Sequence, residues 1–262
     1  MTRQIKGLCG AIVLVLAGHA AAATTWTLDT SATGVAGNNS SETATSTAWA
    51  NTGSGTPVSS QLLEQQTATT YFRSYTGGLG INNLDGCAAP CTGDVGDLAS
   101  LAPEHAIDNQ QRYEMVLVSF GPAKVNVTGV TFGWIGTDSD YTILAYTGVV
   151  APISLAGQTW GALQTGWTAI GNYANAPINT LLATGTSVYS SYWLIGAYNP
   201  LAGGDAGFNA NYYDYVKLQT VVGTVDPRIP PTTKVPEPGS LALIGLALVG
   251  MLYTRQRRWA RA

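Results

Sequence analysis

Charge is scarce in this chain of 262 residues, in which only 10% of positions are charged. An ordinary soluble domain carries about 25% charged residues, and this composition, with 31 glycines, is typical of a turn-rich extracellular β protein. Between Thr24 and Pro236, fourteen acidic residues outnumber six basic ones, for a net charge near −8. Such a surface repels phosphate backbones, so the composition excludes nucleic acid as a partner.

Long apolar runs are also missing, and the run near the N-terminus is short. Arg3 and Lys6 precede an apolar stretch at residues 8–17, and four alanines follow at 20–23. This order is typical of a secretory signal peptide, and the apolar stretch is too short to span a bilayer as a permanent anchor. We therefore expect residues 1–23 to be read by the Sec translocon and removed by signal peptidase.

Cysteine is nearly absent, since only Cys87 and Cys91 remain once the signal peptide is removed. In an exported protein a close pair favours a disulfide that pins one loop, and two free thiols are the alternative. A metal site would need further histidine or cysteine ligands nearby, and the sequence offers none.

Short apolar runs separated by turn residues predict strands throughout the middle of the chain. The clearest runs are YEMVLVSFG, KVNVTGVTFGWIG, TDSDYTILAYTG, SSYWLIGAYN and DYVKLQTVVG. No window of similar strength has helical periodicity outside the two ends. We expect an all-β fold, one jelly-roll-like β-sandwich over residues 24–222, with a weakly structured, Ser/Thr-rich part at 24–70.

Two details of these runs are specific enough to test. Gly129 interrupts an alternating run and predicts a β-bulge or a tight bend. In the next run, Tyr141, Ile143 and Ala145 fall on one strand face, while Thr142, Leu144 and Tyr146 fall on the other.

The C-terminal region has three parts. Residues 223–235 are rich in proline and predict an extended spacer. Residues 241–253 form an uncharged run of about 20 Å if helical, short of a ~30 Å hydrocarbon core, but flanking residues can extend it, and we expect a short transmembrane helix here. Four arginines follow and place the C-terminus in the cytoplasm by the positive-inside rule: Arg255, Arg257, Arg258 and Arg261. A buried core helix is the alternative interpretation of 241–253.

This order of elements resembles the PEP-CTERM sorting signal over residues 236–262. The short motif consists of Val235, Pro236, Glu237 and Pro238, and it is followed by the apolar run and the arginine cluster. The resemblance implies processing by an exosortase, a membrane-embedded transpeptidase. It also implies an inner-membrane precursor, release to the cell surface or extracellular matrix, and a bacterium that makes exopolysaccharide.

The body also resembles the exosortase-dependent surface proteins. Matching stretches are PEHAIDN, GWIGTDSDYTILAYTG, SSYWLIGAYN and DYVKL, within residues 78–223. This resemblance implies the same location and no particular activity.

One histidine, His105, remains after removal of the signal peptide, and Asp108 lies three positions later. With a serine these residues would suggest a hydrolase triad, but no nucleophile motif accompanies them. A polar turn is the competing interpretation, and we expect no catalytic activity.

Asp138 and Asp140 are two residues apart in a loop. Oxygen-rich loops suit Ca²⁺, although the register of an EF-hand is missing. Solvated aspartates that stabilise a turn are the alternative. Apart from this Ca²⁺ hypothesis, no cofactor is expected.

Aromatic residues suggest sugar binding, because their faces stack on pyranose rings. The candidates in Gly/Asn-rich loops are Trp160, Trp167, Tyr173 and Tyr198, and packing in a sandwich core is the alternative. The sequence therefore predicts an exported surface or matrix protein with a structural or adhesive role in extracellular polysaccharide. A Ca²⁺-dependent carbohydrate-binding module is the second hypothesis, and a hydrolase using His105 is the third.

Overall fold

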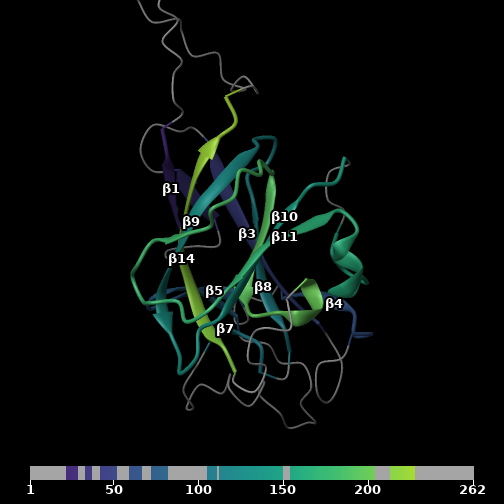
Figure 1. Cartoon of the computed structure of the whole chain (residues 1–262). Coiled ribbons are helices and arrows are strands. Elements are labelled where there is room, and N and C mark those ends of the chain that lie inside the picture. Colours follow the sequence, from purple (N-terminus) through teal and green to yellow (C-terminus); the bar gives the residue numbers. More distant parts are fainter. Residues whose placement is uncertain are drawn as a thin grey trace, which may run out of the picture. The chain divides into compact units, whose positions relative to one another are not determined.

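The computed structural model describes residues 22–28, 33–36, 42–51, 59–66, 72–81, 105–110, 112–149, 154–203 and 213–227. These residues form antiparallel strands with two short 3₁₀ helices, so the predicted all-β class is confirmed (Figure 1). No helix within these ranges has the length and apolar character needed to cross a membrane. The predicted signal peptide and the apolar run at 241–253 lie outside the described residues.

The described residues form fourteen strands and two 3₁₀ helices. The first half contains β1 (Thr24–Thr27), β2 (Thr33–Ala36), β3 (Thr43–Asn51), β4 (Leu63–Gln66), β5 (Phe72–Tyr75), β6 (Gly78–Ile81), β7 (Ile107–Asp108) and β8 (Glu114–Ser119). The second half contains β9 (Val125–Ile135), β10 (Tyr141–Tyr146), η1 (Gly161–Gln164), β11 (Trp167–Tyr173), β12 (Leu182–Ala183), β13 (Tyr192–Ala197), η2 (Pro200–Ala202) and β14 (Tyr215–Val225).

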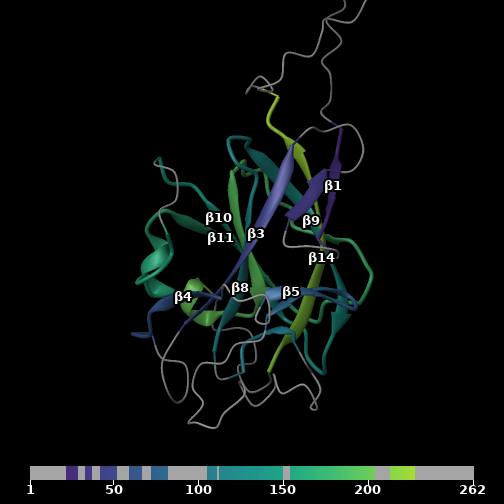
Figure 2. The same cartoon turned by 180° about the vertical axis from the view of Figure 1, so that it is seen from behind.

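Two layers make up the sandwich. In one layer the strand order is β11-β10-β13-β8-β3, with β4 on the far edge of β3. In the other, the long strand β14 pairs with β9 on one side and with β1, β6 and β7 on the other. β2 bridges β3 and β1, so hydrogen bonds run continuously from one layer to the other (Figure 2).

The main hydrophobic core lies between the layers. Its largest fully buried side chains include Trp26 from β1, Phe132 from β9 and Trp193 from β13. Burying side chains of this kind stabilises the fold by about 1.5–3 kcal/mol each. Because Trp26 and Leu28 are fully buried, the described parts of residues 24–70 belong to the sandwich, whereas the other parts of this Ser/Thr-rich segment lie outside the described residues.

A second hydrophobic cluster covers the outer face of the β10-β13-β8 layer. Leu144 and Leu194 point into it from the strands, and Trp160 and Leu163 close it from the η1 segment. The predicted alternation of β10 is thereby confirmed, because Tyr141, Ile143 and Ala145 pack in the main core while Leu144 and Tyr146 pack in the outer cluster.

The irregularity predicted at Gly129 is present. On β14, Val222 pairs with Gly129, whereas the next residue, Gly223, pairs with Val127. Thr128 is therefore an extra residue, and this is the arrangement of a β-bulge. A side chain at Gly129 would lie 2.8 Å from a Leu181 methyl group and 3.0 Å from the Leu182 carbonyl oxygen, so glycine also permits the close approach of residues 181–182.

The predicted end of the domain at Val222 is too early. β14 continues to Val225, and the Asp226 amide donates a hydrogen bond of 2.8 Å to the Lys124 carbonyl. Pairing with β9 provides hydrogen-bond partners for the backbone of residues 223–225. The proline content of the sequence alone assigns these residues to the spacer.

Candidate functional site

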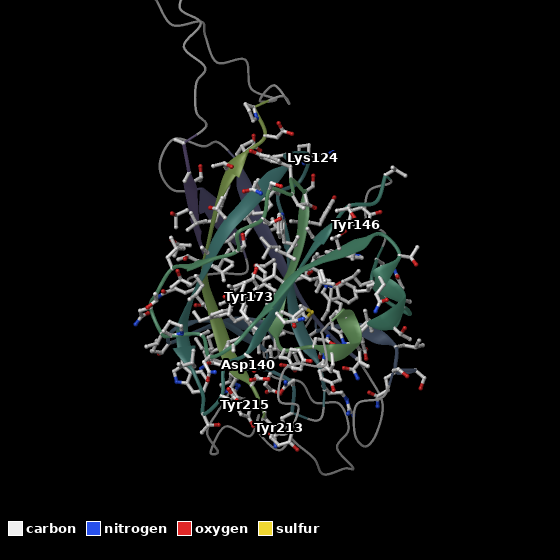
Figure 3. The ribbon with its side chains drawn as sticks, in the orientation of Figure 1. Lys124, Asp140, Tyr146, Tyr173, Tyr213 and Tyr215 are labelled. Atoms are coloured by element: carbon white, nitrogen blue, oxygen red, sulfur yellow. The ribbon has the colours of Figure 1, made fainter. Side chains whose placement is uncertain are left out.

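Three aspartates from two distant segments come together at one end of the sandwich. Asp138 and Asp140 lie in the turn between β9 and β10, and Asp214 directly precedes β14. One carboxylate oxygen from each lies within 4.8 Å of the others. Figure 3 places Asp140 near Tyr213 and Tyr215, at the end of the sandwich opposite Lys124 and Tyr146.

Backbone pairing brings the two segments together. Asp138 and Asp214 form an isolated parallel bridge. The Tyr215 amide donates to the Asp138 carbonyl at 3.0 Å, and the Gly136 amide donates to the Tyr215 carbonyl at 2.9 Å. The long β9–β14 ladder therefore fixes the position of the cluster, since both segments are its direct extensions.

Each carboxylate accepts hydrogen bonds from nearby N–H groups. Asp214 accepts from the Asp140 amide at 2.8 Å and from the Asn109 side chain at 2.6 Å. The Asn175 amide donates to Asp140 at 2.7 Å, and the Ser139 amide donates to Asp138 at 3.0 Å. The three carboxylates thus accept hydrogen bonds from three different parts of the chain: Asn109, Asn175 and the 139–140 turn.

Burial makes ionisation of this cluster unfavourable. It raises the pKa of Asp214 to about 7, and the neighbouring carboxylates of Asp140 and Asp138 add to this, while the hydrogen bonds from Asp140 and Asn109 oppose it. Burial also raises the pKa of Asp140, helped by Asp138 and opposed by the Asn175 hydrogen bond. A bound cation would reverse this balance by stabilising the ionised carboxylates.

The geometry is compatible with a Ca²⁺ ion. Ca²⁺ binds oxygen ligands at 2.3–2.6 Å, so two ligands on opposite sides of one ion lie roughly 5 Å apart. The 4.8 Å limit of the three aspartates fits within this span. Three carboxylates are fewer than the 6–8 oxygens that Ca²⁺ takes, so water or other oxygens would have to complete the shell.

Sequence reasoning found Asp138 and Asp140 and missed Asp214. Nothing near Asp214 marks it as a ligand, because it lies more than seventy residues away and precedes an ordinary strand run. Only the pairing of β14 with β9 brings it to the turn. A further pair of closely spaced aspartates in the sequence, Asp94 and Asp97, lies outside the described residues.

Three of the four aromatic residues proposed for sugar stacking are in the interior, and this corrects that expectation. Trp160 is fully buried, Trp167 is 6% exposed and Tyr198 is 2% exposed. The Trp160 ring nitrogen lies within hydrogen-bond distance of the Tyr113 carbonyl at 3.2 Å and of the Asn51 side-chain oxygen at 3.3 Å. A sugar could stack on these rings only if the core opened.

Tyr173 is the one candidate that is partly exposed. Its ring stacks on Tyr141 at 4.8 Å between centroids, and its hydroxyl donates to the Thr184 carbonyl at 2.9 Å. These contacts fix the ring against the edge of the sandwich.

His105 occupies a turn with a left-handed backbone, at φ 57°. Its ring stacks on Tyr75, with centroids 4.2 Å apart and planes 6° apart. The Asp108 carboxylate accepts from the Gln110 amide at 2.8 Å, as expected of an aspartate that stabilises a turn. Both residues therefore have packing or turn roles in the fold.

The C-terminal region matches a known sorting motif. Residues 234–258 match the family model of the PEP-CTERM protein-sorting motif. The chain carries a PEP-CTERM sorting signal. The match includes Pro236, Glu237, Pro238 and the apolar run, and the motif supports export through exosortase-type sorting. No curated protein and no solved structure matches this chain.

The PEP-CTERM match extends to residue 258. It therefore covers Val235, Arg255, Arg257 and Arg258, while Arg261 lies just beyond it. These residues, together with Cys87 and Cys91, lie outside the described parts of the structure, so the predicted disulfide stays a prediction.

Proposed function

We propose that this chain is a non-catalytic protein of the cell surface or extracellular matrix, with a structural or adhesive role in extracellular polysaccharide. The observation that carries the proposal is the PEP-CTERM motif at residues 234–258, which supports export and exosortase-type processing. The precursor would sit in the inner membrane with its arginine cluster in the cytoplasm and its β-sandwich outside.

The non-catalytic part of the proposal draws support from the roles of the reactive and aromatic side chains. His105 is stacked on Tyr75, and the rings of Trp160 and Tyr198 are buried in packing. We expect a His105→Ala variant to leave any hydrolase activity of the wild type unchanged. A loss of activity in that variant would contradict this part of the proposal.

Intact mass tests the sorting step directly. The full chain is expressed in its producing cells and recovered from envelope, matrix and medium. We expect the wild type to lose the residues after the Pro-Glu-Pro motif and to co-purify with extracellular polysaccharide. The variant Pro236→Ala/Glu237→Ala/Pro238→Ala should keep its full tail and stay in the inner membrane.

A matched control separates the motif from general proline content. Pro230→Ala/Pro231→Ala changes two prolines of the spacer, outside the matched residues 234–258. This variant should be processed like the wild type. A wild-type chain that keeps its complete tail would overturn the sorting proposal and identify the tail as a plain membrane anchor.

The clustered aspartates favour one second candidate, a Ca²⁺-dependent carbohydrate-binding module. The supporting observation is that Asp138, Asp140 and Asp214 place carboxylate oxygens within 4.8 Å of one another. On this hypothesis Ca²⁺ raises the melting temperature and tightens polysaccharide binding. Both effects should vanish in Asp214→Asn and persist in Glu64→Gln, which removes an exposed charge from β4. A wild type that responds to neither measurement rejects the hypothesis.

A further inference from the structure

The chain contains a single aspartate–proline bond. Asp226 is the only aspartate that is followed by a proline, and the pair lies in the stretch TVDPRIPP, directly after β14. Peptide bonds of this type are unusually labile in mild acid, because the aspartate side chain attacks its own backbone carbonyl group. The position of the bond in the fold decides what such a cleavage does to the protein.

Proline makes this bond labile for two reasons. Its nitrogen belongs to a tertiary amide, which takes up a proton more readily than the nitrogen of an ordinary peptide bond. Proline also has no N–H group, so its nitrogen cannot attack the aspartate side chain and form the succinimide that competes with cleavage at other aspartates. The reaction at Asp226–Pro227 is therefore directed towards scission of the chain.

The bond lies at the boundary of the folded domain. Val225 and Val125 are the last residue pair of the β9–β14 ladder, and the Asp226 amide donates to the Lys124 carbonyl at 2.8 Å. The chain divides into two units directly after Pro227. Among the described residues, Asp226 is thus the last one whose backbone is hydrogen-bonded to the sandwich.

The two residues of the bond differ in exposure. Asp226 is 4% exposed, whereas Pro227 is exposed. Within the described parts of the chain, Pro227 takes part in no hydrogen bond. The leaving nitrogen is therefore open to protons from the solvent. The carboxyl group of Asp226 stays within reach of the carbonyl carbon that it attacks, because both groups belong to one residue.

We propose that the Asp226–Pro227 bond is a self-cleavage site through which mild acid releases the folded domain from the spacer and the sorting signal. The released domain keeps all fourteen described strands, because the cut falls after the last of them. It loses the region matched by the PEP-CTERM motif, which begins at residue 234. This release is slow, needs no enzyme and is independent of exosortase-type processing.

The chemistry requires only these two residues and water. An oxygen of the Asp226 carboxylic acid adds to the carbonyl carbon of the same residue. The bond from that carbon to the Pro227 nitrogen breaks, and the proton of the acid passes to that nitrogen. Water then opens the resulting cyclic anhydride and leaves Asp226 as an ordinary C-terminus. The two products together contain one added water molecule, and nothing is oxidised or reduced.

Intact mass of the full chain, purified from its producing cells and incubated in detergent micelles, tests the proposal. We expect a fragment that ends at Asp226 to accumulate over days. It should form faster as the pH is lowered from 7 to about 4, because protonation of the proline nitrogen assists its departure. The fragment should keep a cooperative thermal melt, since it holds the complete sandwich.

Two variants remove the chemistry, one on each side of the bond. Pro227→Ala keeps the carboxyl group and restores an N–H, and Asp226→Asn removes the acid while keeping its shape. Both should slow the cleavage at least about tenfold, because the intramolecular nucleophile or its leaving group is lost. Pro122→Ala is the matched control. It changes another exposed proline, which follows a glycine, and should be cleaved after Asp226 like the wild type.

Three results would overturn the proposal. A wild type that stays intact at the lowest pH rejects it, and cleavage of a synthetic peptide of residues 222–231 under the same conditions would then show that the fold protects the bond. Cleavage of Pro227→Ala and Asp226→Asn at the wild-type rate would assign the cut to a protease in the preparation. A fragment without a cooperative melt would mean that the released domain does not stay folded. Loss of the tail after Pro-Glu-Pro gives a different mass, so failure of this proposal and failure of the sorting proposal remain distinct.

Discussion

The two hydrophobic clusters of this protein differ in what encloses them. The main core lies between two layers of strands, so long pieces of regular structure form both of its walls. The outer cluster has the β10-β13-β8 layer on one side, but on the other it is closed by η1 and the loops around it. The walls of the first cluster are therefore held together largely by backbone pairing between strands. The outer wall of the second is held in place largely by side-chain contacts.

This difference explains why only the main core was visible in the sequence. In a strand with one buried face, apolar residues recur at every second position, as they do in β10, and this pattern predicts the buried face. Trp160 and Leu163 belong to a short 3₁₀ turn in a Gly-rich segment, where no period can develop. Residue type alone therefore predicts ligand contacts for aromatic residues in such a segment, although Trp160 packs in one cluster with Leu144 and Leu194.

The largest expected effect comes from emptying the main core. Trp193→Ala removes a fully buried indole whose nitrogen donates to the Ser190 carbonyl at 3.2 Å. We expect a loss of about 3–5 kcal/mol in the free energy of unfolding, measured by urea denaturation. A loss below about 1 kcal/mol would mean that the two layers are not packed to native density.

Emptying the outer cluster should have a smaller and more local effect. Leu163→Ala should cost about 2–3 kcal/mol, because the loops that close this cluster can relax around the vacated space. Hydrogen exchange should accelerate in η1 and β11 while β9 and β14 keep their protection.

Gln164→Ala, at an exposed position of the same 3₁₀ helix, is the control and should change stability by less than about 0.5 kcal/mol. Uniform acceleration across both layers in Leu163→Ala would show that the two clusters unfold as one unit.

The free energy of unfolding should depend on pH through Asp214, which directly precedes β14. The pKa of Asp214 is raised to about 7 in the fold, above the ordinary value of about 3.9. The folded state therefore binds the extra proton between these values, and stability should rise as pH falls from 8 towards 5. Screening by nearby solvent limits the gain to about 1–2 kcal/mol.

Thermal melts across this pH range measure the effect. Asp214→Asn should flatten the profile. If a cation binds the cluster, Ca²⁺ should also flatten the wild-type profile by favouring the ionised form. A wild type whose stability falls on acidification from pH 8 to 5 would contradict the assigned direction of the Asp214 shift.

The smallest expected effect is the loss of a helix cap in the outer cluster. The Asn199 side chain accepts hydrogen bonds from the Leu201 and Ala202 amides at the start of η2. Asn199→Ala should cost about 1 kcal/mol, and Asn199→Ser, which keeps an acceptor, should recover part of it. Equal losses in both variants, measured by urea denaturation, would attribute the effect to packing and not to the cap.

Five of the fourteen strands followed clearly from the sequence. The runs that contain β8, β9, β10, β13 and β14 were each predicted, and the bulge beside Gly129 was expected from one glycine in an alternating strand. The boundary at Val222 was wrong, because a Pro-rich region gives no sign that β9 continues to pair with the last residues of β14.

The candidate site was predicted only in part. Asp138 and Asp140 are neighbours in the chain, so their proximity is local information. Asp214 joins them through long-range strand pairing, which no spacing in the sequence encodes. The same limitation applies to the four sugar-stacking candidates, whose residue type says nothing about which rings fold inwards.

By itself, the sequence determined that this protein carries a sorting signal and that its fold is all-β. The sorting signal is a linear motif in residues 234–258, and strand periodicity is a local property, so both can be recognised without coordinates. Only the tertiary structure decided that three aspartates converge and that Trp160 is buried. These are contacts between distant segments, and they arise because folding buries apolar faces and pairs strands across the whole chain.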